Sequence, residues 1–352
     1  MLLYIHIPFC DSKCFYCAFN SYTSLHSLRN DYMEALYCEL KTRLEKHNTK
    51  IETIFIGGGT PSTIKAHKYK KVLEIVKPYL VNNCEITIEA NPNSASRKWL
   101  EEIHKIGINR VSFGVQSFDD KKLKFLGRNH NKAQAIEAIN NAKDVGFENI
   151  NCDIIYDTEV DNKEILENDI GIIKNLPVNH ISAYSLIIEE GTKFFEKKNV
   201  QVENEKLARF LFDEFKNLGF LQYEISNFAM NEKAQSEHNL GYWQYKEYLG
   251  IGCGAVGCID NKRLYSQKDV HKYIVDPLAY VEIEELSKDD ILIEKVLLGF
   301  RSIVGVDISL FDSKQKEKID ILVTENKVDK IDSKIYSKDF MLADELALFL
   351  DI

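Results

Sequence analysis

The feature that most restricts the fold of this chain is an alternation of short apolar segments with amphipathic ones through residue 222. Six segments rich in β-branched and aromatic residues are predicted strands: residues 2–9, 51–56, 85–89, 110–113, 149–155 and 180–187. Helical spacing of apolar residues follows each of them, at 33–44, 68–80, 97–106, 133–145, 162–176 and 205–218. Strand and helix repeated in this way require parallel pairing and right-handed crossovers. The sequence therefore predicts an α/β fold, a partial (β/α)6 TIM-like barrel, with a doubly wound open sheet as the alternative.

The chain after residue 222 lacks this alternation of strands and helices. The sequence therefore predicts two domains. We expect a barrel-type domain at residues 1–222 and a smaller α+β domain at 223–352. A composition of 45% hydrophobic and 28% charged residues is that of a globular protein. The net charge of −9 argues against nucleic acid as a partner. No apolar run approaches the roughly 20 residues of a membrane span, and the start lacks a signal peptide, so we expect a cytoplasmic protein.

Three cysteines follow the first predicted strand directly. Cys10, Cys14 and Cys17 form a CxxxCxxC array, which can bring three thiolates toward a common centre. Iron–sulfur clusters are held by cysteine thiolates, usually four for a [4Fe–4S] cluster, so three ligands leave one iron open. The alternative is a structural zinc ion completed by His6 or His26. The other cysteines stand apart and are expected to be small core residues: Cys38, Cys84, Cys152, Cys253 and Cys258.

A glycine-rich segment, Gly57-Gly58-Gly59-Thr60, follows the second predicted strand. Consecutive glycines let the backbone approach a ligand, so that amide groups can point at a carboxylate or phosphate. An ordinary strand-to-helix turn, with Thr60 or Ser62 as the N-cap, explains the segment about as well. By itself the segment indicates a tight turn.

Polar side chains stand at or near the ends of the next three predicted strands. These are Glu89, Gln116 and Asp153, with Arg128 in the segment after the fourth strand. The carboxyl ends of parallel barrel strands converge on one rim, where active sites are found. The cysteines, the glycines and these polar residues are therefore predicted to line a single site.

The segment Tyr4-Ile-His-Ile-Pro-Phe-Cys10-Asp-Ser-Lys-Cys14-Phe-Tyr-Cys17 resembles the cluster loop of the radical S-adenosylmethionine (SAM) superfamily. The resemblance is to the branch that contains oxygen-independent coproporphyrinogen III oxidases and HemW heme chaperones. It implies a [4Fe–4S] cluster whose open iron chelates the amine and carboxylate of SAM, and cleavage of the sulfonium to a 5′-deoxyadenosyl radical. It also implies contacts with SAM by Tyr4, Tyr16, Gly58, Gly59, Thr60, Glu89, Gln116, Arg128 and Asp153.

Three features favour the HemW side of this branch. The oxidases carry a further cysteine two residues after the third ligand, where this chain has Phe19, and they have a longer extension before the cluster loop. The segment His238-Asn-Leu-Gly-Tyr242-Trp243 resembles the HNxxYW motif associated with heme binding in HemW proteins. The resemblance therefore implies heme contacts by His238, Tyr242 and Trp243. The alternative is that His238 bonds locally while the two aromatic residues fill a core between domains.

Three functions fit these features. The first is a heme carrier that holds a [4Fe–4S] cluster, SAM and heme, and delivers heme to respiratory apoproteins, with transient contact to membrane proteins. The second is an enzyme, an oxygen-independent coproporphyrinogen III oxidase that forms protoporphyrinogen IX. The third is a radical SAM methylase. Whether the protein is an enzyme depends on which of these holds.

Overall fold

The computed structural model describes residues 1–197 and 199–352, and its largest element is a twelve-stranded sheet. Six strands lie in the sheet in the order of the chain, each parallel to the next: β1 (Leu2–Ile7), β2 (Ile51–Gly58), β3 (Leu80–Ala90), β4 (Arg110–Gln116), β5 (Asn149–Tyr156) and β6 (His180–Ser185). A doubly wound sheet reverses its strand order at a switch point, and these strands do not. The predicted α/β fold of partial-barrel type is confirmed.

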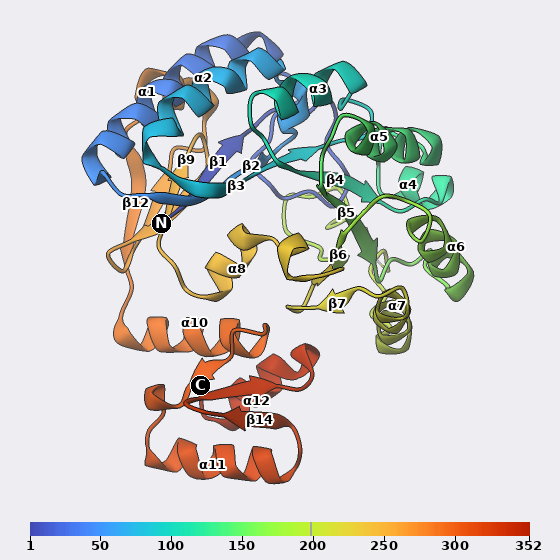
Figure 1. The fold of residues 1–352 in the computed structure, drawn as a ribbon, viewed down its shortest axis with the longest axis vertical. Coiled ribbons are helices and arrows are strands. Elements are labelled where there is room, and N and C mark those ends of the chain that lie inside the picture. The colour runs from blue at the N-terminus through green and yellow to red at the C-terminus, as the bar shows by residue number, and fades with distance from the viewer. Residues whose placement is uncertain (198) are drawn as a thin grey trace.

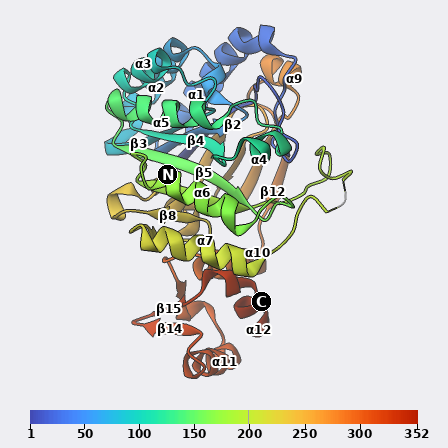
Figure 2. The same ribbon diagram turned by 90° about the vertical axis from the view of Figure 1, so that its right-hand side faces the viewer.

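The helices that connect these strands cover one face of the sheet (Figure 1, Figure 2). They are α1 (Arg29–His47), α2 (Ala66–Val76), α3 (Arg97–Lys105), α5 (Lys132–Asp144), α6 (Lys163–Ile173) and α7 (Glu205–Asn217), with the short α4 (Asp120–Phe125) after β4. Strand side chains alternate between the two faces. In β1, Leu3, Ile5 and Ile7 are buried in the main hydrophobic core, so Tyr4 and His6 point to the opposite, inner face.

The sheet extends beyond the six parallel strands at both edges. Next to β1 come β9 (Tyr248–Ile251), β10 (Val256–Ile259), β11 (Lys262–Ser266) and β12 (Tyr280–Glu285), and next to β6 come β8 (Asn227–Ala229) and β7 (Leu221–Gln222). Sequence analysis missed these strands. Residues 248–285 therefore share a sheet with β1, although they lie in the predicted second domain, and α9 (Val270–Val275) packs on α1.

The last part of the chain has its own core. It contains α10 (Lys288–Phe300), β13 (Val306–Asp307), α11 (Ser313–Thr324), β14 (Val328–Ile331), β15 (Lys334–Ser337) and α12 (Ala343–Phe349). Val296 and Phe300 of α10 are buried in this small unit and not in the main core. Figure 1 shows α10 between the small unit and the sheet. The boundary at residues 222 and 223 stays a prediction. Single turns of 3-10 helix lie at His26–Leu28, Pro61–Thr63, Lys77–Tyr79, Glu232–Ala234, Ile308–Leu310 and Phe340–Leu342.

One helix, α8 (Glu237–Trp243), lies on the inner face of the sheet (Figure 1). The Glu85 carboxylate of β3 accepts hydrogen bonds from the amides of Glu237 and His238, each at 3.1 Å, which satisfies donors at the start of the helix. The His238 ring is bonded to the Thr53 hydroxyl of β2 at 2.7 Å. These contacts hold α8 toward the amino ends of the strands, and Asn239 of α8 lines the same cavity as the cysteine loop. In the described part of the chain no helix has the length and apolar character to span a membrane.

Candidate radical SAM site

A cavity of about 450 Å³ opens at the carboxyl ends of the parallel strands, and Cys10, Cys14 and Cys17 line it. The sulfurs of Cys10 and Cys14 each accept a hydrogen bond from a side chain. The Thr60 hydroxyl donates to Cys10 Sγ at 3.3 Å, and the Arg128 guanidinium donates to Cys14 Sγ at 3.2 Å. Burial raises the pKa of the Cys10 and Cys17 thiols, whereas a cation and a hydroxyl at sulfur favour the thiolate that binds iron.

This donor set fits an iron–sulfur cluster. Three thiols on one short loop can each meet a different iron atom, and the cavity beside them leaves room at a fourth. Within residues 1–197 and 199–352, no three His, Cys, Asp or Glu side chains converge as ligands of a single metal ion, as a structural zinc would require. The His6 ring is already bonded to the Tyr4 hydroxyl at 2.9 Å and the Asn20 carbonyl at 2.8 Å.

The glycine-rich segment packs against the cluster loop. The amide of Gly59 donates to the Ile7 carbonyl at 2.8 Å, and that of Gly58 donates to the Glu89 carboxylate at 3.1 Å. The amide of Thr60 also bonds to the loop. These three amides have partners within the protein, and the predicted contacts of Gly58, Gly59 and Thr60 with SAM stay predictions. Gly58 has a φ of 109°, and a Cβ on Gly59 would lie 2.8 Å from the Ile7 carbonyl oxygen, so close packing explains both glycines.

Two carboxyl groups, Glu89 of β3 and Asp153 of β5, face the cavity. Burial raises the pKa of Glu89 to about 8, and the neighbouring Asp153 charge adds to the effect. Burial also raises the pKa of Asp153. Hydrogen bonds to its carboxylate, including one from the Asn151 amide at 2.6 Å, partly oppose this rise. Burial therefore favours the protonated form of the Glu89 carboxyl group. A ligand amine or hydroxyl group would supply the donors that such oxygens accept.

Gln116 and Arg128 complete the rim. Gln116 has a φ of 71°, and the pairing of β4 with β5 shifts register between Phe113 and Gln116. A non-glycine residue in this conformation is strained, and such strain concentrates at functional sites. Arg128 donates to the Asn91 side chain at 2.7 Å, and its buried Nε has no partner among the described residues. The guanidinium is thus held in place beside the cluster loop.

The structure brings most of the predicted residues together. The cavity is lined by Cys10, Cys14, Cys17, Tyr16, Gly58, Gly59, Thr60, Glu89, Gln116, Arg128 and Asp153. Tyr4 and Tyr242 instead line a second, adjoining cavity, and His238 and Trp243 line neither. Their roles as SAM and heme contacts stay predictions.

Sequence analysis missed several polar residues of the site: Asn91, Arg110, Ser112, Asn151, Ser182 and Tyr184. The available signal was polarity at alternate, inward-facing positions of otherwise apolar strands. Of the cysteines expected in the core, Cys84, Cys152 and Cys253 are buried, whereas Cys38 is exposed on α1 and Cys258 is half-buried on β10.

His238 is buried and fully bonded. Its Nδ1 meets the Thr53 hydroxyl at 2.7 Å, and its Nε2 meets the Tyr242 hydroxyl at 3.0 Å. Burial lowers the pKa of the ring to about 3, so the ring is neutral. Iron ligation by His238 would require one of these two hydrogen bonds to be exchanged for iron.

Comparison with known proteins agrees with this geometry. Residues 4–170 match the radical SAM superfamily, so fold and site together define a radical SAM protein, and the superfamily implies a [4Fe–4S] cluster and SAM. The chain is 33% identical to the heme chaperone HemW of Bacillus subtilis over 90% of its length and 87% of that protein. It is 36% identical to HemW of Escherichia coli over 76% of its length and 74% of that protein. The chain belongs to the HemW family.

A solved structure shares the whole fold. The radical SAM enzyme coproporphyrinogen III oxidase (HemN) from Escherichia coli superposes with a TM-score of 0.83, covering 99% of this chain and 89% of that one at 20% identity. At this level of identity the likeness concerns the fold alone.

Proposed function

We propose that this protein is a cytoplasmic heme carrier that holds a [4Fe–4S] cluster and SAM, accepts heme, and delivers it to respiratory apoproteins. The observation that carries the proposal is the similarity to proteins named heme chaperones over 90% of the chain. The presence of Phe19 in place of the oxidases' further cysteine is consistent with it.

The residues around the first cavity suit binding of a cluster and SAM. Cys10, Cys14 and Cys17 would hold the cluster, which when bound supplies an electron to the sulfonium of SAM. Arg128 presents a fixed cation that pairs with a carboxylate, and the oxygens of Glu89 can accept from an amine or ribose hydroxyls.

Heme titration tests the carrier function. The cluster is reconstituted without oxygen, hemin is added in steps, and the Soret band is followed. We expect saturable binding with a shifted Soret band near one heme per chain. A linear increase that matches free hemin would refute the proposal.

The second candidate is coproporphyrinogen III oxidation, favoured by the HemN-like fold of the whole chain. Incubation with coproporphyrinogen III, SAM and a reductant tests it. Release of two carbon dioxide molecules per substrate with formation of vinyl groups would replace the carrier proposal by an enzymatic one. We expect neither product.

A further inference from the structure

Four consecutive hydrogen bonds join the start of helix α8 to the cavity of the cysteine loop. The Ser236 amide donates to the Tyr223 hydroxyl at 3.1 Å, and this hydroxyl is bonded to His180 Nε2 at 2.7 Å. His180 Nδ1 is bonded to the side-chain oxygen of Asn151 at 2.6 Å, and the Asn151 amide donates to the Asp153 carboxylate at 2.6 Å. Ser236 is the N-cap of α8, and Asp153 lines the cavity. These five residues form a hydrogen-bond chain from α8 to the predicted SAM site.

Both ends of this hydrogen-bond chain set the same direction of donation. A backbone amide can only donate and a carboxylate can only accept, so every group between them donates toward Asp153. The Tyr223 hydroxyl therefore donates to His180 Nε2, and the proton of the His180 ring lies on Nδ1. Burial keeps the pKa of His180 well below its usual value, so the ring is neutral. The neutral ring has the one donor and the one acceptor that the chain requires.

The hydrogen-bond chain is closed to water. His180, Asn151 and Tyr223 are each 1% exposed, and Ser236 is fully buried. A buried hydrogen bond that is lost is not replaced by a bond to water, and aligned hydrogen bonds strengthen one another. A change at one end of the chain is therefore compensated within the protein and not by solvent.

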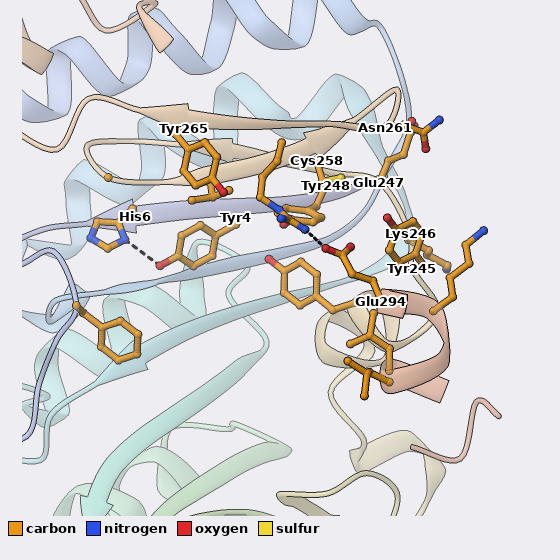
Figure 3. A pocket seen from close by; sticks show the side chains of 18 of the residues that line it. Tyr4, His6, Tyr245, Lys246, Glu247, Tyr248, Cys258, Asn261, Tyr265 and Glu294 are labelled. Carbon is orange, nitrogen blue, oxygen red and sulfur yellow. Dashed lines mark hydrogen bonds and ion pairs between the residues drawn. The ribbon is translucent and has the colours of Figure 1, made fainter. Parts of the chain in front are cut away.

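Helix α8 borders two cavities. Asn239 lines the first cavity together with the cysteine loop, and Tyr242 lines the second, which has a volume of about 1050 Å³. Figure 3 shows this second cavity, with Tyr4 from β1 and Glu294 from α10 in its wall. Asn239 and Tyr242 are less than one helical turn apart. A shift of the first turn of α8 would therefore move the walls of both cavities.

Order at one end of the hydrogen-bond chain should favour order at the other. Asp153 is predicted to contact SAM, and a ligand hydroxyl that donates to its carboxylate would fix the position of that carboxylate. The Asn151 amide donates to the same carboxylate, so it is fixed as well, and His180 and Tyr223 follow. Binding that removes motion at one site lowers the cost of ordering a second site joined to it.

We propose that His180 and Tyr223 are positioning residues that couple the SAM site to helix α8, so that SAM binding orders the first turn of the helix. The inference rests on the proposed function, in which SAM binds beside Asp153. Thermodynamic linkage makes the effect reciprocal, so an ordered α8 strengthens SAM binding by the same factor. SAM then acts on the wall of the second cavity without entering that cavity.

Tyr223→Phe tests the coupling, because it removes only the hydroxyl that links Ser236 to His180. The matched control is Tyr273→Phe, since Tyr273 is also 1% exposed and its hydroxyl donates to Glu39 at 2.8 Å, outside the chain. The cluster is reconstituted anaerobically, and amide hydrogen exchange in α8 is measured with and without SAM. No reductant is added, so that SAM is not cleaved. Equilibrium dialysis gives the affinity for SAM, while visible absorption of the cluster and the melting temperature report folding.

We expect SAM to slow hydrogen exchange at the start of α8 in the unmodified protein and in Tyr273→Phe. In Tyr223→Phe we expect this SAM-dependent protection to be lost and SAM to bind about fivefold more weakly, at the lower end of the range for coupled sites. Equal protection in both variants would refute the coupling and would instead indicate direct contact of SAM with Asn239. If Tyr223→Phe does not fold, His180→Phe breaks the chain one link nearer to Asp153, with the same expected result.

The unmodified protein separates failure of this inference from failure of the proposed function. If it binds SAM and exchange in α8 does not change, the coupling is wrong and the proposed function stands. If it binds no SAM after the cluster is reconstituted, the proposed function fails and the coupling fails with it.

Discussion

The sulfur of Cys14 receives a hydrogen bond from Arg128, a residue that is fixed in turn by the Asn91 side chain. Hydrogen bonds from charged donors stabilise a thiolate and tune the clusters it holds. Arg128 therefore connects the cluster loop to the rim of the barrel. Substitutions of single residues should accordingly affect the cluster and the rest of the site separately.

Cys14→Ser should abolish the cluster. We expect loss of the broad visible absorption and of bound iron after anaerobic reconstitution, because a thiolate ligand is removed. Cys38→Ser is the matched control, since Cys38 is exposed on α1. Equal iron and sulfide content in both variants would contradict the assignment.

Glu89→Gln should change how stability depends on pH. The pKa of Glu89 is about 8 in the folded protein against 4.5 for the free side chain. The folded state therefore binds this proton more tightly, and the ligand-free protein loses stability as pH rises from 4.5 to about 8. The amide does not titrate, so we expect a flatter melting temperature profile across this window and a gain of a few degrees at pH 8. Parallel profiles for the two proteins would show that Glu89 does not titrate there.

At the scale of elements, α8 is held inside the sheet by side chains of two strands. Glu85 bonds to its first amides and Thr53 to His238. Both nitrogens of His238 are satisfied, so the ring has a structural role that is independent of heme.

His238→Gln should lower stability at neutral pH by about 1–3 kcal/mol, because it disturbs a buried hydrogen-bonded pair. The pKa of His238 is about 3, below the usual 6.5, so the stability from the neutral ring is present above pH 6.5 and is lost as pH falls toward 3. The variant should lack this contribution, which approaches 1.4 kcal/mol per pH unit. Chemical unfolding at pH 7 and pH 5 measures it, with His271→Gln, at an exposed position of α9, as control. Equal slopes would contradict the buried neutral ring.

The predictable elements were those with local signals. The parallel strands are runs of β-branched residues followed by amphipathic helices, and strand-end polarity was enough to group Glu89, Gln116 and Asp153. Strands β10 and β12 carried no such signal. The short β10 contains a glycine, and in β12 glutamates interrupt the apolar residues. Their place depends on pairing with distant segments. The position of α8 likewise depends on Glu85, which lies far away in the sequence.

At the scale of the whole molecule, the second cavity has a floor in the main sheet and a roof on α10, which belongs to the small C-terminal core. A ligand slows hydrogen exchange most in the elements that it contacts. We expect heme to slow amide hydrogen exchange in α8, which carries the HNxxYW segment, and to leave α11 unchanged. Protection confined to β10, β11 and α10 would instead favour binding in the second cavity.

The main sheet and the C-terminal unit bury separate sets of apolar side chains, so each part has a hydrophobic core of its own. The cysteine loop follows β1 and belongs to the sheet. Loss of packing in the C-terminal unit would therefore leave the apolar residues that support the cysteine loop in place.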